Sequence, residues 1–269
     1  MAAVTDPVPP TEPASDSVDT PAIGPPTREA ERRHSPEVLA RSARIMDASG
    51  ARRQVITVVC ALGHVHNPTF ARELGDDPRF AVIGQCTSVD EAERSVIDLM
   101  PGVALIGLRL SPEPSDAPRL CATLRDQCPP VAIVAVGDDD SAEVLFECVR
   151  AGARSCFTGR GATGTPSGTL ARVVTGTQRG ESLLSAAVTQ KVLDDYERLE
   201  RSPGDVLAPT PELTAEEEEV LGLLAAGETP SSIADELEVT TRVVGLHAGH
   251  AVAKLHRTYH DDSVLAQLR

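Results

Sequence analysis

The chain has 269 residues, with 40 Asp and Glu against 25 Lys and Arg, which gives a formal net charge of −15. This acidic balance disfavours a protein that coats nucleic acid or anionic membrane through bulk charge, although it is compatible with a local basic face. Residues 1–10 lack a basic and apolar leader, and the longest apolar runs are of strand length, so neither a secretory signal nor a membrane span is expected. The six cysteines form no CxxC pair and no metal-ligand spacing, which predicts reduced thiols in a cytoplasmic chain without a metal or other cofactor.

The N-terminal segment, residues 1–50, is expected to be a Pro- and Ala-rich tail. Seven of the 21 prolines lie in residues 1–34, together with Ala, Thr, Ser and acids and without aromatic residues. Such a composition buries too little apolar surface to offset its ordering entropy, so disorder is predicted. Ser35 followed by Pro36 is typical of a helix start, and a short helix to Ala48 is an alternative to continued tail.

Residues 54–180 alternate between strand-like and helix-like segments. Each strand-like segment is a short apolar run, and Ser88 followed by Glu91 predicts a capping box at the start of one helix. Five apolar strands separated by helices predict a doubly wound parallel sheet that is buried on both faces. The strands are expected at 55–60, 80–86, 103–108, 131–136 and 155–158, and the helices at 68–76, from 88 onward, at 116–127, 141–151 and 167–177.

The remainder of the chain is predicted to be helical. Residues 181–211 are expected to form a connection, with one long helix over 182–200 followed by a Pro-containing linker. Within residues 212–269, Thr214 and Glu217 predict a capping box, Pro230 starts a second helix to Leu237, and Thr240 caps a third helix to about Tyr259. Two helices joined by a short turn, the second of them long, are typical of a helix-turn-helix.

A set of residues in this helical segment forms a more specific pattern. The pattern consists of Leu213-Thr214, Glu218 to Leu221, Leu223-Leu224, Gly227, Ile233-Ala234, Glu236-Leu237, Val239-Thr240, Val244, His247 and Lys254-Leu255. It resembles the LuxR/NarL-type DNA-binding domain, and residues 54–180, with the turn Ala151-Gly152-Ala153, resemble the receiver domain of two-domain response regulators. The resemblance implies a flavodoxin-like five-stranded receiver followed by an all-α domain, in a homodimeric transcription regulator that binds DNA and is not an enzyme.

The receiver region departs from its family at the phosphorylation site. The resemblance implies an acidic pair, a phosphoryl-accepting Asp, a Thr or Ser and a Lys, and the corresponding positions hold Ala61, Leu62, Gly107, Ala135 and Gly159. Residues 55–67 and 103–112 contain no carboxylate, so no small shift in register restores a ligand for Mg²⁺ or an acceptor. The sequence therefore predicts a pseudo-receiver that is not phosphorylated. Its less charged and roomier rim is a candidate site for a protein partner or a small ligand.

Three other motifs have simpler interpretations. Asp138-Asp139-Asp140 is interpreted as a solvated turn, and residues 159–165 as a flexible loop because the Lys of a phosphate-binding loop is missing. His64 and His66 lack a third metal ligand and are interpreted as surface histidines.

The third helix of the C-terminal segment carries the candidate DNA contacts. These are Thr240, Thr241, Arg242, His247, Lys254 and Arg257. However, residues 213–269 hold 4 Lys and Arg against 10 Asp and Glu, a net charge of −6, and Gly245 and Leu246 stand where the family often has Lys and a polar residue. Two hypotheses follow: a phosphorylation-independent regulator that binds DNA, or a scaffold whose degenerate helix-turn-helix binds protein.

Overall fold

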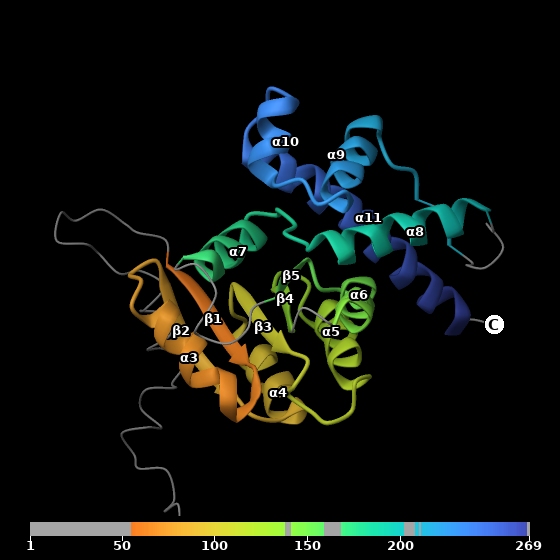
Figure 1. Ribbon diagram of the computed structural model, residues 1–269. Coiled ribbons are helices and arrows are strands. Elements are labelled where there is room, and N and C mark those ends of the chain that lie inside the picture. Colours follow the sequence, from red (N-terminus) through yellow and green to blue (C-terminus); the bar gives the residue numbers. More distant parts are fainter. Residues whose placement is uncertain (1–54, 138–140, 159–167, 202–207, 210, 268–269) are drawn as a thin grey trace, which may run out of the picture.

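The computed structural model describes residues 55–137, 141–158, 168–201, 208–209 and 211–267, and the expected tail lies outside them. Within this part of the chain, a sheet flanked by helices is followed by a group of helices, with one long helix between the two (Figure 1). The described residues thus divide into a receiver-like part and a helical part, as the sequence predicts.

The sheet has five parallel strands in the order β2-β1-β3-β4-β5. Successive residues of β1 and β3 point to opposite faces of the sheet, and the residues on both faces are buried because helices cover each face. This is the doubly wound parallel sheet that the alternating segments predict. The strands are β1 (Ile56–Ala61), β2 (Phe80–Cys86), β3 (Val103–Gly107), β4 (Ala132–Gly137) and β5 (Ser155–Thr158).

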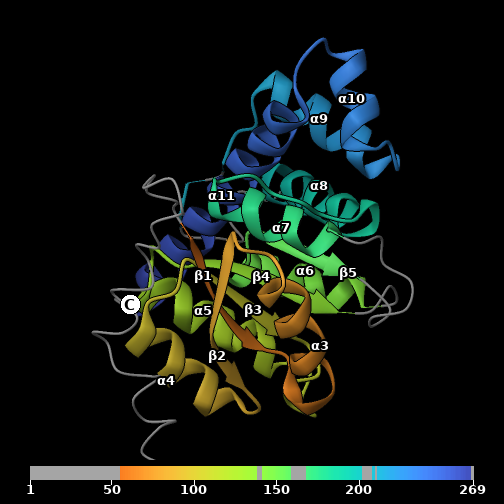
Figure 2. The same cartoon turned by 90° about the vertical axis from the view of Figure 1, so that its left-hand side faces the viewer.

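Helices cover the sheet in two groups, which lie on opposite sides of it (Figure 2). One face packs against α3 (Gly63–Gly75) and α7 (Thr169–Gln178), whereas the other packs against α4 (Val89–Leu99), α5 (Asp116–Gln127) and α6 (Ala142–Ala151). The prediction that the first helix starts at residue 68 is wrong by five residues, because Pro68 lies inside α3 rather than at its start. At α4, the Ser88 hydroxyl caps the Glu91 amide as expected, but the Glu91 carboxylate accepts from the Thr87 amide instead of closing the box on Ser88.

The helical part begins with α8 (Ala186–Arg201) and continues with α9 (Ala215–Ala225), α10 (Pro230–Glu236) and α11 (Thr241–Gln267). The capping box of α9 is confirmed: the Thr214 hydroxyl accepts from the Glu217 amide at 3.3 Å, and the Glu217 carboxylate accepts from the Thr214 amide at 2.9 Å. The Thr240 hydroxyl caps α11 by accepting from the Val243 amide at 3.3 Å. The predicted end of this helix at Tyr259 is wrong, since α11 continues to Gln267.

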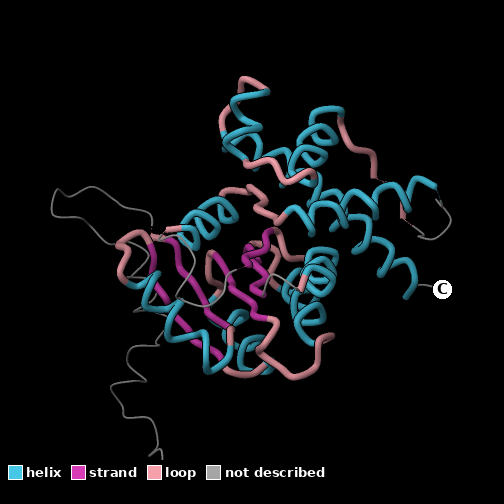
Figure 3. Tube along the Cα trace, in the orientation of Figure 1, coloured by secondary structure: helices cyan, strands magenta, loops and turns pink. Residues whose placement is uncertain are grey.

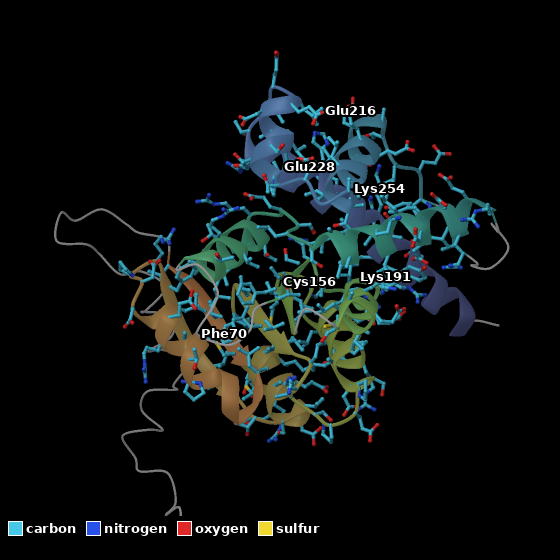
Figure 4. All side chains as sticks on the ribbon, viewed as in Figure 1. Phe70, Cys156, Lys191, Glu216, Glu228 and Lys254 are labelled. Atoms are coloured by element: carbon cyan, nitrogen blue, oxygen red, sulfur yellow. The ribbon has the colours of Figure 1, made fainter. Side chains whose placement is uncertain are left out.

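The long helix α8 joins the two parts through contacts on both sides. The Tyr196 hydroxyl donates to the Ala251 carbonyl of α11 at 2.6 Å, and Lys191 pairs with Glu143 of α6. Figure 4 shows Lys191 between these parts of the molecule. One connected set of buried residues therefore extends from the α4, α5 and α6 side of the sheet through α8 into the helical part.

Candidate functional site

The rim of the sheet at the carboxyl ends of β1, β3 and β4 brings together four of the five residues at the predicted phosphorylation site. Ala61 is the last residue of β1, and Leu62 follows it. Gly107 is the last residue of β3, and Ala135 lies in β4. The strand order reverses between β1 and β3, so this is the topological switch point at which doubly wound folds bind ligands. Gly159 and the acidic run at 138–140 lie outside the described residues.

Aliphatic side chains fill the rim. A Cβ atom at Gly107 would lie 3.0 Å from Leu62 Cα and 3.2 Å from Leu62 Cδ2, and Leu62 is only 1% exposed. In the same way, a Cβ atom at Gly137 would lie 2.8 Å from a methyl carbon of Leu108. The expectation of a roomier rim is therefore wrong, because Leu62 occupies the space that the missing side chain at position 107 would leave.

The residues at this rim do not fit a divalent cation. A hard cation such as Mg²⁺ requires oxygen ligands, and Ala61, Leu62 and Gly107 carry no side-chain oxygen. Among the described residues, no three His, Cys, Asp or Glu side chains are grouped so that they could hold a metal ion. The side chains of His64 and His66 lie outside the described set.

The buried cysteines are placed as core residues. Cys60 and Cys86 lie at adjacent positions in the sheet, and burial followed by the neighbouring Cys86 thiol raises the pKa of Cys60 to about 12. Burial likewise places the pKa of the Cys156 thiol well above its usual value. A thiol with a raised pKa remains protonated near neutral pH and is a poor nucleophile.

The helix-turn-helix presents the first predicted DNA contacts at its exposed turn. Glu238 has a φ of 54° between α10 and α11, which reverses the chain so that Thr240, Thr241 and Arg242 open the second helix. Thr240 and Thr241 are exposed, and the Arg242 side chain is 61% exposed. Arg242 is nevertheless directed toward the receiver-like part, where its Nε lies 3.9 Å from a Glu181 carboxylate oxygen.

The remaining predicted DNA contacts have different surroundings. Lys254 Nζ donates to the buried Glu217 carboxylate at 2.6 Å and to the Glu212 carbonyl at 2.8 Å. Figure 4 shows Lys254 inside the helical part, near α9. His247 is half-buried, and Arg257 is exposed. The structure therefore does not gather the six residues on one surface, since Arg242 and Lys254 each face an acidic partner.

One face of α11 is docked on the receiver-like part. The Ser182 amide donates to the Gly245 carbonyl at 2.8 Å, and a Cβ atom at Gly249 would lie 2.1 Å from the Gly180 carbonyl oxygen. Farther along the same helix, His256 Nε2 hydrogen-bonds the Val149 carbonyl of α6 at 2.7 Å. Residues 245, 249 and 256 share one helix face because they are spaced by four and seven. Figure 3 shows the loop between α7 and α8 passing below the helical part.

A polar cluster around the buried Asp195 holds the C-terminal half of α11 against α8 and α6. The Tyr259 hydroxyl donates to Asp195 of α8 at 2.5 Å, and Arg198 donates to both Asp195 and the Tyr259 oxygen at 2.8 and 2.7 Å. The Arg150 guanidinium of α6 lies 4.4 Å from the centre of the Tyr259 ring. Burial, followed by the neighbouring Asp195, raises the pKa of Tyr259 to about 12, so this hydroxyl remains a donor at neutral pH.

These interdomain contacts are the functional features that the sequence interpretation missed. From the sequence, Gly245 is interpreted only as a departure from the Lys that the family often has, and no role is predicted for Gly249. Their spacing of four places two residues without a side chain on one face of α11, and this permits close approach of another backbone. The contacts of Tyr259 and His256 could not be found this way, because they depend on how α11 packs against α8 and α6 in the folded chain.

The fold and the site together define a class of protein. A five-stranded receiver-like domain followed by a helix-turn-helix domain is the arrangement of LuxR-type response regulators, which are transcription regulators. Residues 211–267 match the family described as bacterial regulatory proteins, luxR family. Across the described residues, no helix is long and apolar enough to cross a bilayer.

Two relatives support the assignment by their sequences. The DNA-binding transcriptional activator DevR/DosR of Mycobacterium tuberculosis is 30% identical over 182 residues, which cover 68% of this chain and 79% of the relative. The transcriptional regulatory protein LiaR of Bacillus subtilis is 29% identical over 182 residues, covering 66% and 80%. The chain is also similar to the solved RcsB response regulator of Salmonella typhimurium, at 18% identity with a TM-score of 0.42, over 74% of this chain and 92% of that one. The chain belongs to the response regulators of the LuxR family.

Proposed function

We propose that this protein is a response-regulator-like transcription regulator that binds DNA through α10 and α11 without being switched by phosphorylation of its receiver-like domain. Its relative DevR/DosR is named as a DNA-binding transcriptional activator, and that name supports a DNA-binding role here. We place it in the cytoplasm, where its target DNA is found.

One observation carries the independence from phosphorylation. The position of the phosphoryl acceptor is Gly107, and Leu62 packs 3.0 Å from where its Cβ atom would be. Phosphoryl transfer to this rim would need both an acceptor oxygen and a cation bound by carboxylates. Residues 55–67 and 103–112 supply neither.

The closed arrangement supports a different kind of switch. The face of α11 that contacts Gly180 and Ser182 cannot lie in a major groove while it is docked. DNA binding therefore requires the helical part to separate from the receiver-like part. We propose that Thr240, Thr241, Arg242, His247, Lys254 and Arg257 approach DNA in the separated form, and that two chains bind together as a homodimer, one recognition helix per half-site.

Selection of DNA fragments from a random pool by the full-length protein tests this proposal. Fragments that share a motif should be enriched, and their affinity should fall as salt rises, because neutralised phosphates release counterions. Light scattering on the selected complex should give two chains per site. Failure to enrich any motif, or a single chain on each site, would contradict the proposal.

A scaffold role is the second candidate function, because residues 213–269 carry a net charge of −6 and Lys254 is paired with Glu217. An acidic helix-turn-helix with one of its few cations engaged internally is suited to contacts with a basic protein. Figure 4 shows Glu216 on the side of the helical part that faces away from the sheet. Stable capture of a protein partner together with the absence of selected DNA would favour this alternative.

A further inference from the structure

A cleft of about 700 Å³ lies between the receiver-like part and the helix-turn-helix. The residues that line it come from both parts: α7 and the α7–α8 segment on one side, and the starts of α10 and α11 on the other. A volume of this size accommodates a small molecule of about the size of a nucleotide.

The charge in the cleft opposes the charge of the whole protein. Four arginines line the cleft, namely Arg79, Arg172, Arg179 and Arg242, and the lining includes a single carboxylate, that of Glu181. Asp77 holds Arg79 in an ion pair at 2.6 Å, and Glu181 lies 3.9 Å from Arg242. Within the described residues, Arg172 and Arg179 have no ion-pair partner. As far as the described residues show, these two cationic groups therefore have no carboxylate partner, although the chain as a whole has a net charge of −15.

Hydroxyl groups and apolar side chains complete the lining. Thr175, Thr229, Ser231 and Thr241 line the cleft, and the buried Thr175 Oγ1 has no hydrogen-bond partner among the described residues. The first turn of α11, which carries the positive end of the helix dipole, lines the same cleft with Thr241 and Arg242. Leu183, Leu184, Leu224, Pro230 and Val244 add apolar surface.

From this combination we infer that the cleft binds a phosphorylated small molecule with an apolar or ring-containing part. Its phosphate groups bind Arg172 and Arg179 from the receiver-like part and Arg242 and Thr241 from the helix-turn-helix. Arginine suits this role because its planar guanidinium can donate two parallel hydrogen bonds to a phosphate. The leucines hold the less polar part of the ligand.

The position of the cleft gives such a ligand a regulatory effect, and this part of the inference rests on the proposed DNA-binding function. Both parts of the protein line the cleft, so the ligand binds the docked form more tightly than the separated form. Differential affinity shifts the equilibrium toward the docked form. Because Thr241 and Arg242 are also proposed DNA contacts, the ligand lowers DNA affinity, and by linkage DNA lowers ligand affinity by the same factor.

Calorimetry with the full-length protein tests the site without reference to DNA. Inorganic pyrophosphate and adenosine triphosphate are titrated separately at fixed ionic strength. We expect the triphosphate to bind once per chain, and the double variant Arg172→Ala with Arg179→Ala to weaken it at least tenfold. Arg242→Ala, on the opposite wall, should weaken it as well. Arg119→Ala with Arg201→Ala removes the same charge from exposed ion pairs outside the cleft and should change affinity less than twofold.

The outcomes are distinguishable. No saturable binding of either probe, or equal weakening by both double variants, would overturn the cleft as a site. Weakening by the receiver-side variant alone would overturn the claim that the ligand bridges the two parts. Binding of labelled duplex selected by the protein is then measured with and without the triphosphate, and an unchanged affinity would overturn the regulatory coupling. If no DNA is bound at all, the proposed function fails while the calorimetric result on the site still stands.

Discussion

Leu62 and Gly107 meet across the ends of β1 and β3, where a receiver would hold its phosphoryl group. The space between them is already filled by the leucine side chain and by backbone atoms. Restoring an acidic side chain at one position therefore does not restore a site, because its carboxylate would be forced into an apolar, close-packed environment.

The Gly107→Asp variant tests this packing. We expect it to lower the free energy of unfolding by about 3 kcal/mol or more, since it both overpacks the rim and buries a charge. It should still take up no label from acetyl phosphate. Urea unfolding measures the first effect, and Gly75→Asp is the matched control, because a Cβ atom at Gly75 has nothing within 4 Å. The packing argument would be contradicted if the Gly107→Asp protein took up label from acetyl phosphate and had the same free energy of unfolding as the unaltered protein.

The pair of Lys254 and Glu217 is a second feature at the residue scale. Glu217 serves both as the capping-box acceptor of α9 and as the partner of Lys254 at 2.6 Å, and its side chain is 5% exposed. A buried charge that loses its partner is costly, so the pair fixes α11 against α9.

Replacing Lys254 by Met should destabilise the protein by about 3 kcal/mol in thermal or urea unfolding, because Glu217 is left buried and unpaired. Adding Glu217→Gln, which retains an oxygen for the cap, should recover most of the loss. The exposed Arg257→Met is the control, with an expected change within about 0.5 kcal/mol. Equal effects of Lys254→Met and Arg257→Met would show that the ion pair contributes nothing.

At the scale of elements, α11 packs into the helical core with one face and contacts the receiver-like part with another. Val244, Ala248 and Leu255 are buried in the helical core, whereas Gly245, Gly249 and His256 meet the receiver-like part. Glycine within a helix costs about 1 kcal/mol relative to alanine. The docked arrangement gives these glycines a structural role, since only a residue without Cβ lets α11 approach the Gly180 carbonyl so closely.

The Gly249→Ala variant should undock α11. Its Cβ would lie 2.1 Å from the Gly180 carbonyl oxygen, so the helical part must move away. We expect a larger radius of gyration in small-angle X-ray scattering and an affinity for selected DNA that rises roughly tenfold. Gly222→Ala is the control: the site on α9 is open, so it should stabilise its helix without either change. Unaltered scattering and DNA affinity in Gly249→Ala would contradict the role of this contact.

At the scale of the whole molecule, the interface between α11 and α6 should respond to pH. Burial, assisted by Arg125 and Arg154 and opposed by the hydrogen bond to the Val149 carbonyl, lowers the pKa of His256 to about 4. The stability contributed by the neutral ring is fully present above a pH of about 6.5, which is the pKa of a histidine in the unfolded chain. It is lost as the pH falls from there toward 4, because the unfolded or undocked state takes up a proton first.

Melting temperature and scattering measured between pH 7.5 and 5 check this response. We expect stability to fall and the molecule to open on acidification, and His256→Gln, which retains a donor for the Val149 carbonyl, to reduce the pH dependence. His260 also contacts Asp126, at 3.1 Å, so the glutamine variant is needed to isolate the contribution of His256. The same pH profile in both proteins would rule out His256 as the titrating group.

Much of this architecture could be predicted from local patterns. Apolar runs such as 103–107 and caps such as Thr214 act within a few residues, so they predict strands and helix starts correctly. The close fit of Leu62 over Gly107 and of Gly249 on Gly180 could not be predicted from the sequence, because each depends on two segments that meet only in the folded chain. The extension of α11 beyond Tyr259 was missed for the same reason, since His260 there contacts Asp126 of α5, which is far away in the sequence.

The most direct test of the central claim is one binding measurement. The affinity of the full-length protein for its selected duplex is determined with and without acetyl phosphate and Mg²⁺ at constant ionic strength. The account predicts salt-dependent binding whose dissociation constant is the same under both conditions. A dissociation constant that changes when the phosphoryl donor is added, with label on the protein, would contradict it.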